Sequence, residues 1–161
     1  MNDMSTPITV GQKMARVPTS FAIDDAHILR SKIIGKCATV ENWLSEQIST
    51  VEKPELMLSQ KIEQLKKLSD QGKVIFKCPQ KLRDRLDAFR SFADFRSEIV
   101  HSEMSLSIVD GTASAIFENA DQICPRIFRK KTLMSLEEFD RVWQDMSKAA
   151  NLLTTLKPNQ R

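Results

Sequence analysis

The sequence predicts a mostly α-helical domain, a bundle of about four helices with a small antiparallel β-hairpin before the last helix. Apolar residues recur every three or four positions in four segments, as on the buried face of a helix. Asp110-Gly111 separates two segments with alternating apolar residues, which is typical of a tight hairpin turn. The length of 161 residues, with 41% apolar and 28% charged side chains, suits one compact domain.

The first predicted helix follows a segment without periodicity. Residues 1–20 contain proline and glycine among small polar residues, so we expect a flexible N-terminal arm before a helical domain at 21–161. The helix is expected to begin at Asp24 or Asp25. Its apolar stripe is Ala26, Leu29, Ile33, Cys37, Val40, Leu44, Ile48 and Val51. Gly35 lies inside this helix, where glycine costs about 1 kcal/mol relative to alanine, and we expect it to permit a close helix contact.

A second helix is expected from Pro54 to about Gln71–Lys73. Its apolar side carries Leu58, Ile62, Leu65 and Leu68, and its polar side carries Lys61, Glu63, Lys66 and Lys67. A short apolar connection, VIFKCPQ, leads to the central helix at Lys81–Glu103. The central helix has an apolar face with one step missing at Arg96, and its face consists of Leu82, Leu86, Phe89, Phe92 and Ile99. Arg83, Arg85 and Arg90 lie among these residues.

The hairpin and a last helix follow the central helix. Alternating apolar residues around Asp110-Gly111 predict two antiparallel strands. Residues 119–131 are expected to be an irregular connection with a short strand near Ile127 and Phe128. This connection also carries a basic group that is usually a solvated face, namely Arg126, Arg129, Lys130 and Lys131. Ser135 and Glu138 match a capping box, after which apolar residues from Phe139 to Leu156 predict the last helix.

Charge, cysteine content and hydrophobicity bear on whether the protein binds nucleic acid, contains disulfides or enters a membrane. With 24 basic and 21 acidic residues, the formal charge of +3 is too small to require a nucleic-acid partner by itself. The three cysteines are far apart in the sequence and odd in number, which favours reduced thiols over a disulfide framework. No apolar run approaches the roughly 20 residues of a membrane helix, and the first residues lack the apolar centre of a signal peptide. We therefore expect a cytoplasmic protein without a membrane partner.

The common metal and cofactor motifs are missing from the sequence. It contains neither CxxC nor HExxH, and His27 and His101 lie far apart. Four scattered glycines exclude a glycine-rich phosphate loop. We therefore expect no metal site and no cofactor, and we interpret His27 as a surface residue near the start of the first helix.

Arg96, Ser97 and His101 form the candidate site. Ser97 and His101 share one helix face at a four-residue spacing, whereas Arg96 lies about 140° around the axis from His101. A guanidinium is a forked cation suited to phosphate, an imidazole exchanges protons near neutral pH, and a serine hydroxyl can orient either group. These groups could cleave RNA without metal. Because the reaction needs both a base and an acid, one site histidine per chain favours a symmetric dimer.

The segment FRSEIVH, from Phe95 to His101, resembles the R-x4-6-H motif of the HEPN superfamily, and the likeness extends in outline over residues 24–157. The resemblance implies a helical-bundle homodimer whose arginine and histidine line a composite cleft and cut RNA without metal. It also implies a toxin–antitoxin or antiviral defence system, with an antitoxin or defence-system protein as a further partner. By this resemblance Arg96 stabilises the scissile phosphate, His101 transfers protons, and Ser97 occupies the polar position after the arginine.

Some residues depart from the family pattern. Ser97 stands where Asn, Asp or His is common, and Ser102 follows the histidine where a small residue such as glycine is common. The hairpin also exceeds the minimal bundle. A non-catalytic HEPN-like module, which dimerises or binds a protein or nucleic acid, is therefore the alternative function. A second alternative is a purely structural helix end, in which Arg96 and His101 form salt bridges with Glu98 and Glu103.

Overall fold

The computed structural model describes residues 20–119 and 131–159. The elements, in order, are α1 (Ser20–Ser49), α2 (Leu58–Asp70), α3 (Pro79–His101), β1 (Ser102–Val109), β2 (Thr112–Asn119), β3 (Lys131–Ser135) and α4 (Leu136–Thr154). The predicted fold class is confirmed, since the described residues form mostly helix with a hairpin before the last helix. Except for Ser20, which begins α1, the predicted N-terminal arm lies outside the described residues.

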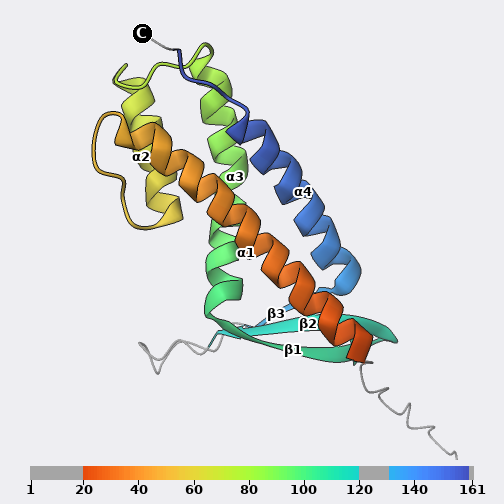
Figure 1. Cartoon of the computed structure of the whole chain (residues 1–161). Helices are drawn as coiled ribbons and strands as arrows, with labels where there is room; N and C mark the ends of the chain where they lie inside the picture. Colours follow the sequence, from red (N-terminus) through yellow and green to blue (C-terminus); the bar gives the residue numbers. More distant parts are fainter. Residues whose placement is uncertain (1–19, 120–130, 160–161) are drawn as a thin grey trace, which may run out of the picture.

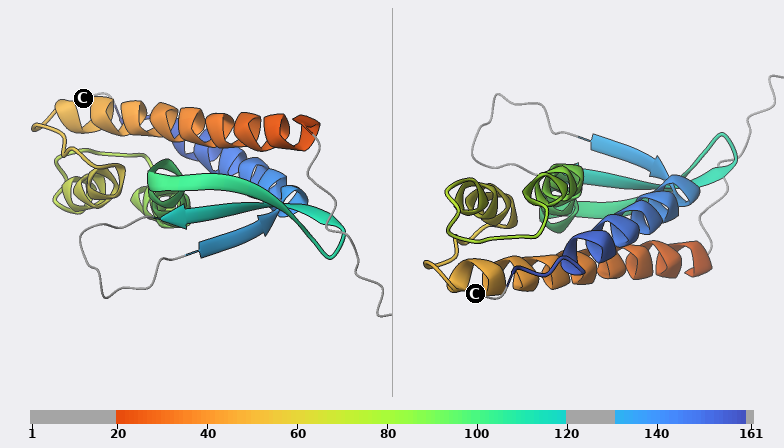
Figure 2. Two further views of the ribbon diagram at one scale, coloured as in Figure 1. Left: turned by 90° about the horizontal axis from the view of Figure 1, so that it is seen from below. Right: turned by 90° about the horizontal axis from the view of Figure 1, so that it is seen from above.

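The helices pack around α1, and the sheet lies at one end of the bundle (Figure 1). α1 contacts each of the other three helices. The sheet lies where α1 begins, where α3 ends and where α4 begins. Figure 2 shows the arrangement from below and from above the view of Figure 1. The last described residues return to the opposite end, where the Asn159 N–H donates to the Ile75 carbonyl at 2.8 Å. The end of α3 that carries the candidate site therefore lies beside the sheet.

The predicted apolar stripe of α1 is buried over most of its length. Seven of its eight members belong to the core, whereas Val51 lies beyond the helix end and is 40% exposed. The expected close contact at Gly35 is wrong, because a Cβ atom built there would meet nothing within 4 Å. Gly35 is exposed on the side of α1 that faces away from the core.

The start of α2 differs from the prediction, and its end agrees with it. The helix begins at Leu58 rather than Pro54, with Met57 as the N-cap residue. At the other end Gly72 has φ +65°, a conformation that glycine adopts without strain. The N–H of Lys73 donates to the Leu68 carbonyl at 2.9 Å, which gives the helix a Schellman ending. The N-cap residue Met57 is extended, and its N–H donates to the Gln60 side chain at 3.3 Å.

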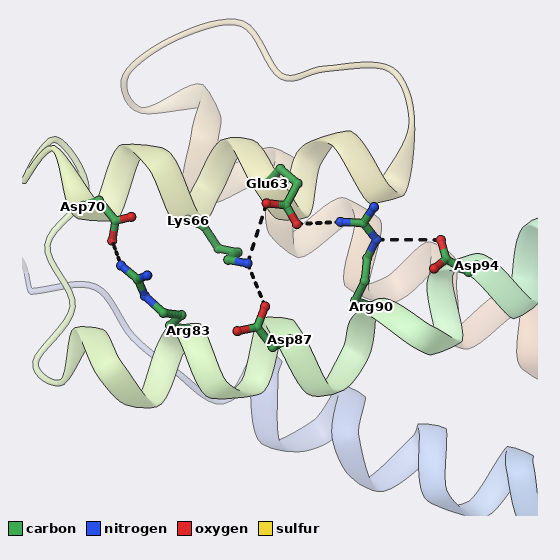
Figure 3. A network of polar contacts seen from close by, with 7 residues as sticks. All are labelled: Glu63, Lys66, Asp70, Arg83, Asp87, Arg90 and Asp94. Atoms are coloured by element: carbon green, nitrogen blue, oxygen red, sulfur yellow. Dashed lines mark hydrogen bonds and ion pairs between the residues drawn. The ribbon is translucent and has the colours of Figure 1, made fainter.

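An ion-pair network joins the outer sides of α2 and α3 (Figure 3). It consists of Glu63, Lys66, Asp70, Arg83, Asp87, Arg90 and Asp94. The Lys66 ammonium lies 2.7 Å from Asp87, and this hydrogen bond is the main cause of the raised pKa of Lys66. Because exposed ion pairs contribute about 0–1 kcal/mol each, the network mainly sets the alignment of the two helices.

The hairpin is confirmed, and a third strand extends it. β1 and β2 are antiparallel, and Val109 pairs with Thr112 across the Asp110-Gly111 turn. The two turn residues have φ +48° and φ +81°, as a type I′ turn requires. β3 pairs with β2, so the sheet order is β1-β2-β3. The predicted strand near Ile127 and Phe128 lies outside the described residues. The central helix was expected to continue to Glu103, but it ends at His101 because β1 begins at Ser102.

Three phenylalanines from different elements connect the bundle to the sheet. Phe117 of β2 and Phe139 of α4 are fully buried, with ring centroids 5.3 Å apart. Phe95 of α3 contacts both rings edge to face, at 6.4 and 6.3 Å. Edge-to-face pairs contribute about 0.5–1.5 kcal/mol beyond the area they bury. This cluster fixes the end of α3 against both neighbours.

We predict that Phe117→Ala lowers the free energy of unfolding by about 3–5 kcal/mol, because it removes a fully buried ring and leaves a cavity. Urea denaturation followed by circular dichroism measures the change. Leu152→Ala is the control, since Leu152 is 54% exposed on α4 and its substitution should have little effect. Equal losses in the two variants would contradict the assigned core.

We predict that the capping box at the start of α4 makes stability depend on pH. The Ser135 N–H and hydroxyl lower the pKa of Glu138, so this stabilisation is present above the unfolded-state pKa and is lost as pH falls through the lowered folded-state value. Ser135→Ala should cost about 1 kcal/mol at pH 7. The difference in stability between wild type and Glu138→Ala should shrink on acidification, as measured by urea denaturation. Glu137→Ala is the control, and an undiminished Glu138→Ala difference would be the contrary result.

Candidate functional site

The three predicted site residues lie in the last part of α3. Arg96 and Ser97 are half-buried, and His101 is exposed as the last residue of the helix. Helix geometry separates the Arg96 and His101 backbones by about 7.5 Å along the axis and about 140° around it. Phe95 packs toward the sheet and α4, whereas Arg96 lies next to the start of α2.

A groove of about 220 Å³ lies where α3 passes α1 and the start of α2. Its lining residues are Glu41, Leu56, Met57, Leu58, Ser59, Ala93, Asp94, Arg96 and Ser97. The structure therefore brings Arg96 and Ser97 together in one groove. His101 is not among the described residues that line it, so the predicted trio does not converge within one copy of this groove.

Arg96 differs from the other arginines of α3 in its contacts. Arg83 binds Asp70, and Arg85 donates to the Leu152 carbonyl of α4. The third, Arg90, lies 2.5 Å from Glu63 of α2.

Among the described residues, Arg96 has no hydrogen-bond or ion-pair partner, and its Nε atom is buried. The Nε atom of Arg90 also lacks a hydrogen bond, but it lies 3.7 Å from the Asp94 carboxylate. Arg85 also has no ion pair among the described residues, but the Leu152 carbonyl accepts its hydrogen bond. Arg96 is thus the one arginine of α3 to which the described residues give neither a hydrogen bond nor an ion pair.

The two carboxylates that line the groove already have cationic neighbours. Glu41 lies 2.8 Å from the Lys61 ammonium, and Lys61 is only 8% exposed. Asp94 is the neighbour of Arg90. The prediction that Lys61 lies on the solvated side of its helix is therefore wrong. Because a buried charge needs a partner, Lys61 turns inward to Glu41, and Arg96 keeps its positive charge available at the groove.

The first turn of α2 lies beside the same groove. The N–H of the N-cap residue Met57 donates to the Gln60 side chain at 3.3 Å, and the first turn contains no acidic residue. The first N–H groups of a helix lack intrahelical partners and lie at the positive end of its dipole. With the guanidinium of Arg96 and the hydroxyls of Ser59 and Ser97 nearby, the groove has the chemistry to bind an anionic oxygen.

Cys37 lies in the interior close to this groove and is fully buried. Burial raises the pKa of its thiol to about 11, Arg96 opposes the increase, and Glu41 adds to it. Its sulfur lies 3.6 Å from the sulfur of Met146. The thiol is therefore protonated near neutral pH, which argues against a role as a nucleophile.

The surroundings of His101 differ from the salt-bridged helix end considered above. Glu98 accepts a hydrogen bond from the Thr132 hydroxyl of β3, and the Ser102 hydroxyl donates to the Glu98 carbonyl at 2.6 Å. His101 lies between these anchored residues, and its side chain is exposed. His27 is also exposed, on α1, as predicted.

Comparisons with protein-family models, curated proteins and solved structures found no match to this chain. Within residues 20–119 and 131–159, no group of three or more potential metal ligands comes together. No helix in the same part of the chain combines the length and the apolar character needed to cross a membrane. The site is therefore interpreted from its own geometry.

Sequence reasoning missed the part of the groove that comes from outside α3. The start of α2 was placed four residues too early, so the exposed segment at Leu56 and Met57 was assigned to a helix. One signal was available, because Lys61 lies three residues after Leu58 and four before Leu65, within the apolar stripe. A lysine in that stripe needs an acidic partner, which is Glu41.

We predict that Cys37 is protected from thiol reagents in the folded protein. Its burial and raised pKa disfavour the reactive thiolate, whereas Cys78 is exposed. Labelling with 4,4′-dithiodipyridine at pH 7, with Cys124 replaced by serine, should modify one thiol rapidly and the second only after unfolding. Cys78→Ser provides the control and should abolish the rapid phase. Rapid labelling of Cys37 in that variant would contradict the assigned burial.

Proposed function

We propose that this chain is a metal-independent endoribonuclease of HEPN type. It acts in the cytoplasm as a homodimer with a composite site, within a toxin–antitoxin or antiviral defence system. The observation that supports the proposal best is the unpaired guanidinium of Arg96 in the groove beside the first turn of α2. Such a group fits a phosphate of RNA, and the motif that contains it ends in an exposed histidine.

In the proposed reaction, one His101 accepts the proton of a ribose 2′-hydroxyl. The 2′-oxygen attacks the adjacent phosphorus, while Arg96 stabilises the charge that develops on the phosphate oxygens. The bond from phosphorus to the 5′-oxygen breaks, and this oxygen takes a proton from a second imidazole. The products are a 2′,3′-cyclic phosphate and a 5′-hydroxyl. Ser97 supports the phosphate through its hydroxyl.

The need for two imidazoles is the reason for the homodimer in this proposal. Each chain has one histidine in the motif, and His101 projects about 140° away from Arg96 around α3. A twofold pairing of two copies would bring two such helix ends to one seam and supply both the base and the acid. Arg96 of one copy would then bind a phosphate that lies between the two copies.

One observation favours the alternative, a non-catalytic module that binds a partner at the same groove. Leu56 is 85% exposed and Met57 is 56% exposed, and both line the groove next to Arg96. Exposed apolar side chains beside an unpaired cation are typical of a protein-binding surface as well. Cleavage assays separate the two functions.

We predict that the purified protein cleaves single-stranded RNA in excess EDTA, and that Arg96→Met and His101→Ala each reduce the rate by about 100-fold or more. Methionine keeps the apolar stem of the arginine, so packing changes little. A 5′-labelled oligonucleotide resolved on a denaturing gel gives the rate and the cyclic-phosphate product.

Two matched substitutions test whether the loss is specific. Arg83→Met removes another arginine of α3, and His27→Ala removes the other histidine, so both should retain activity. Full activity in Arg96→Met or His101→Ala would overturn the ribonuclease assignment. If wild type leaves RNA intact while Leu56→Ser abolishes binding of a cellular protein, the alternative function is favoured.

A further inference from the structure

Arg30 of α1 reaches the junction between α3 and β1. Its Nη2 atom lies 3.1 Å from the Ser102 carbonyl and 3.5 Å from the Val100 carbonyl. These two carbonyls belong to the residues on either side of His101. The one guanidinium group therefore holds the backbone before and after the exposed histidine.

The junction needs such a donor because α3 has no glycine ending. The C-cap residue Ser102 is extended, with φ −95° and ψ 144°, and the chain passes directly into β1. The last carbonyls of a helix have no intrahelical N–H partners and lie at the negative end of its dipole. A cationic donor at this place both pairs the carbonyls and complements the dipole.

We propose that Arg30 is a positioning residue for His101. Because the imidazole is exposed, its placement depends on the backbone that carries it, and Arg30 ties that backbone to the core helix α1. α1 also carries Glu41, which lines the groove that contains Arg96. One helix therefore contacts both the groove and the backbone beside His101. A catalytic benefit from positioning His101 rests on the proposed ribonuclease function, whereas the positioning of His101 by Arg30 does not depend on it.

The test compares Arg30→Met with Arg30→Lys and with the control Lys36→Met. Lys36 lies on the same helix and makes an exposed hydrogen bond to Asn151 at 3.2 Å. In single-turnover cleavage, Arg30→Met should lower the rate constant by about 10- to 100-fold, because small displacements of a reacting group cost this much. The RNA concentration at half-maximal rate should change less than about threefold, since Arg96 still binds phosphate. Arg30→Lys should restore part of the rate, and Lys36→Met should match wild type.

A second readout does not depend on catalysis. In 1H–13C spectra the imidazole signals of His101, assigned with His101→Ala, should shift and broaden in Arg30→Met but remain as in wild type in Lys36→Met. Amide exchange at residues 101–103 should quicken in the same variant. Arg30→Gln, a smaller polar change, replaces Arg30→Met if the latter does not fold.

The outcomes distinguish the two proposals. If wild type fails to cleave RNA, the proposed function fails, and the spectra alone then decide the role of Arg30. Unchanged His101 signals and exchange rates in a folded Arg30→Met or Arg30→Gln protein would overturn the positioning role. So would an equal loss of rate in Lys36→Met, because the effect would then belong to α1 as a whole.

Discussion

The contact of Phe95 with Phe117 and Phe139 determines how α3 is rotated, and the candidate site depends on that rotation. Phe95 fits between the sheet and α4, with both partner rings fully buried. Successive helix residues are about 100° apart, so fixing Phe95 turns Arg96 toward α2. A helix with a different apolar residue in contact with the sheet would present Arg96 elsewhere. The position of Arg96 at the groove is therefore a consequence of the packing of Phe95, about 100° away around α3.

The arginines of α3 divide into structural ones and one that is available for binding. Arg83 and Arg90 align α2 with α3 through exposed pairs worth about 0–1 kcal/mol each, and Arg85 binds the end of α4. Arg96 contributes no comparable contact with the described residues, and its buried Nε is unpaired. Leaving a buried donor unpaired costs about 1–3 kcal/mol. A domain that tolerates this cost must recover stability elsewhere, here in the core around α1.

Local patterns were enough to predict the elements but not their inward-facing polar groups. The stripe of α1, the Asp110-Gly111 turn and the Ser135–Glu138 capping box each depend on a few neighbouring residues, and all three are confirmed. The apolar stripe of α3 has Arg96 where an apolar residue is expected, and Phe95, one position earlier, packs against the core instead. Lys61 was misplaced because its partner Glu41 lies 20 residues away on another helix. Such pairs depend on tertiary packing that helical periodicity does not encode.

The candidate site shows the same division between local and distant information. The spacing of Arg96 and His101 can be seen along one helix, yet the surroundings of each residue come from distant segments. The start of α2 lies beside Arg96, and Arg30 binds the carbonyls of the residues before and after His101, which lie 70 and 72 positions later in the sequence. Local and global preferences usually agree in a folded protein, and they conflict mainly where function requires it. Arg96 is such a conflict, since a partly buried, unpaired cation weakens the fold that holds it. An anion in the groove would remove that cost, so the feature that is least favourable for stability is the one best suited to binding.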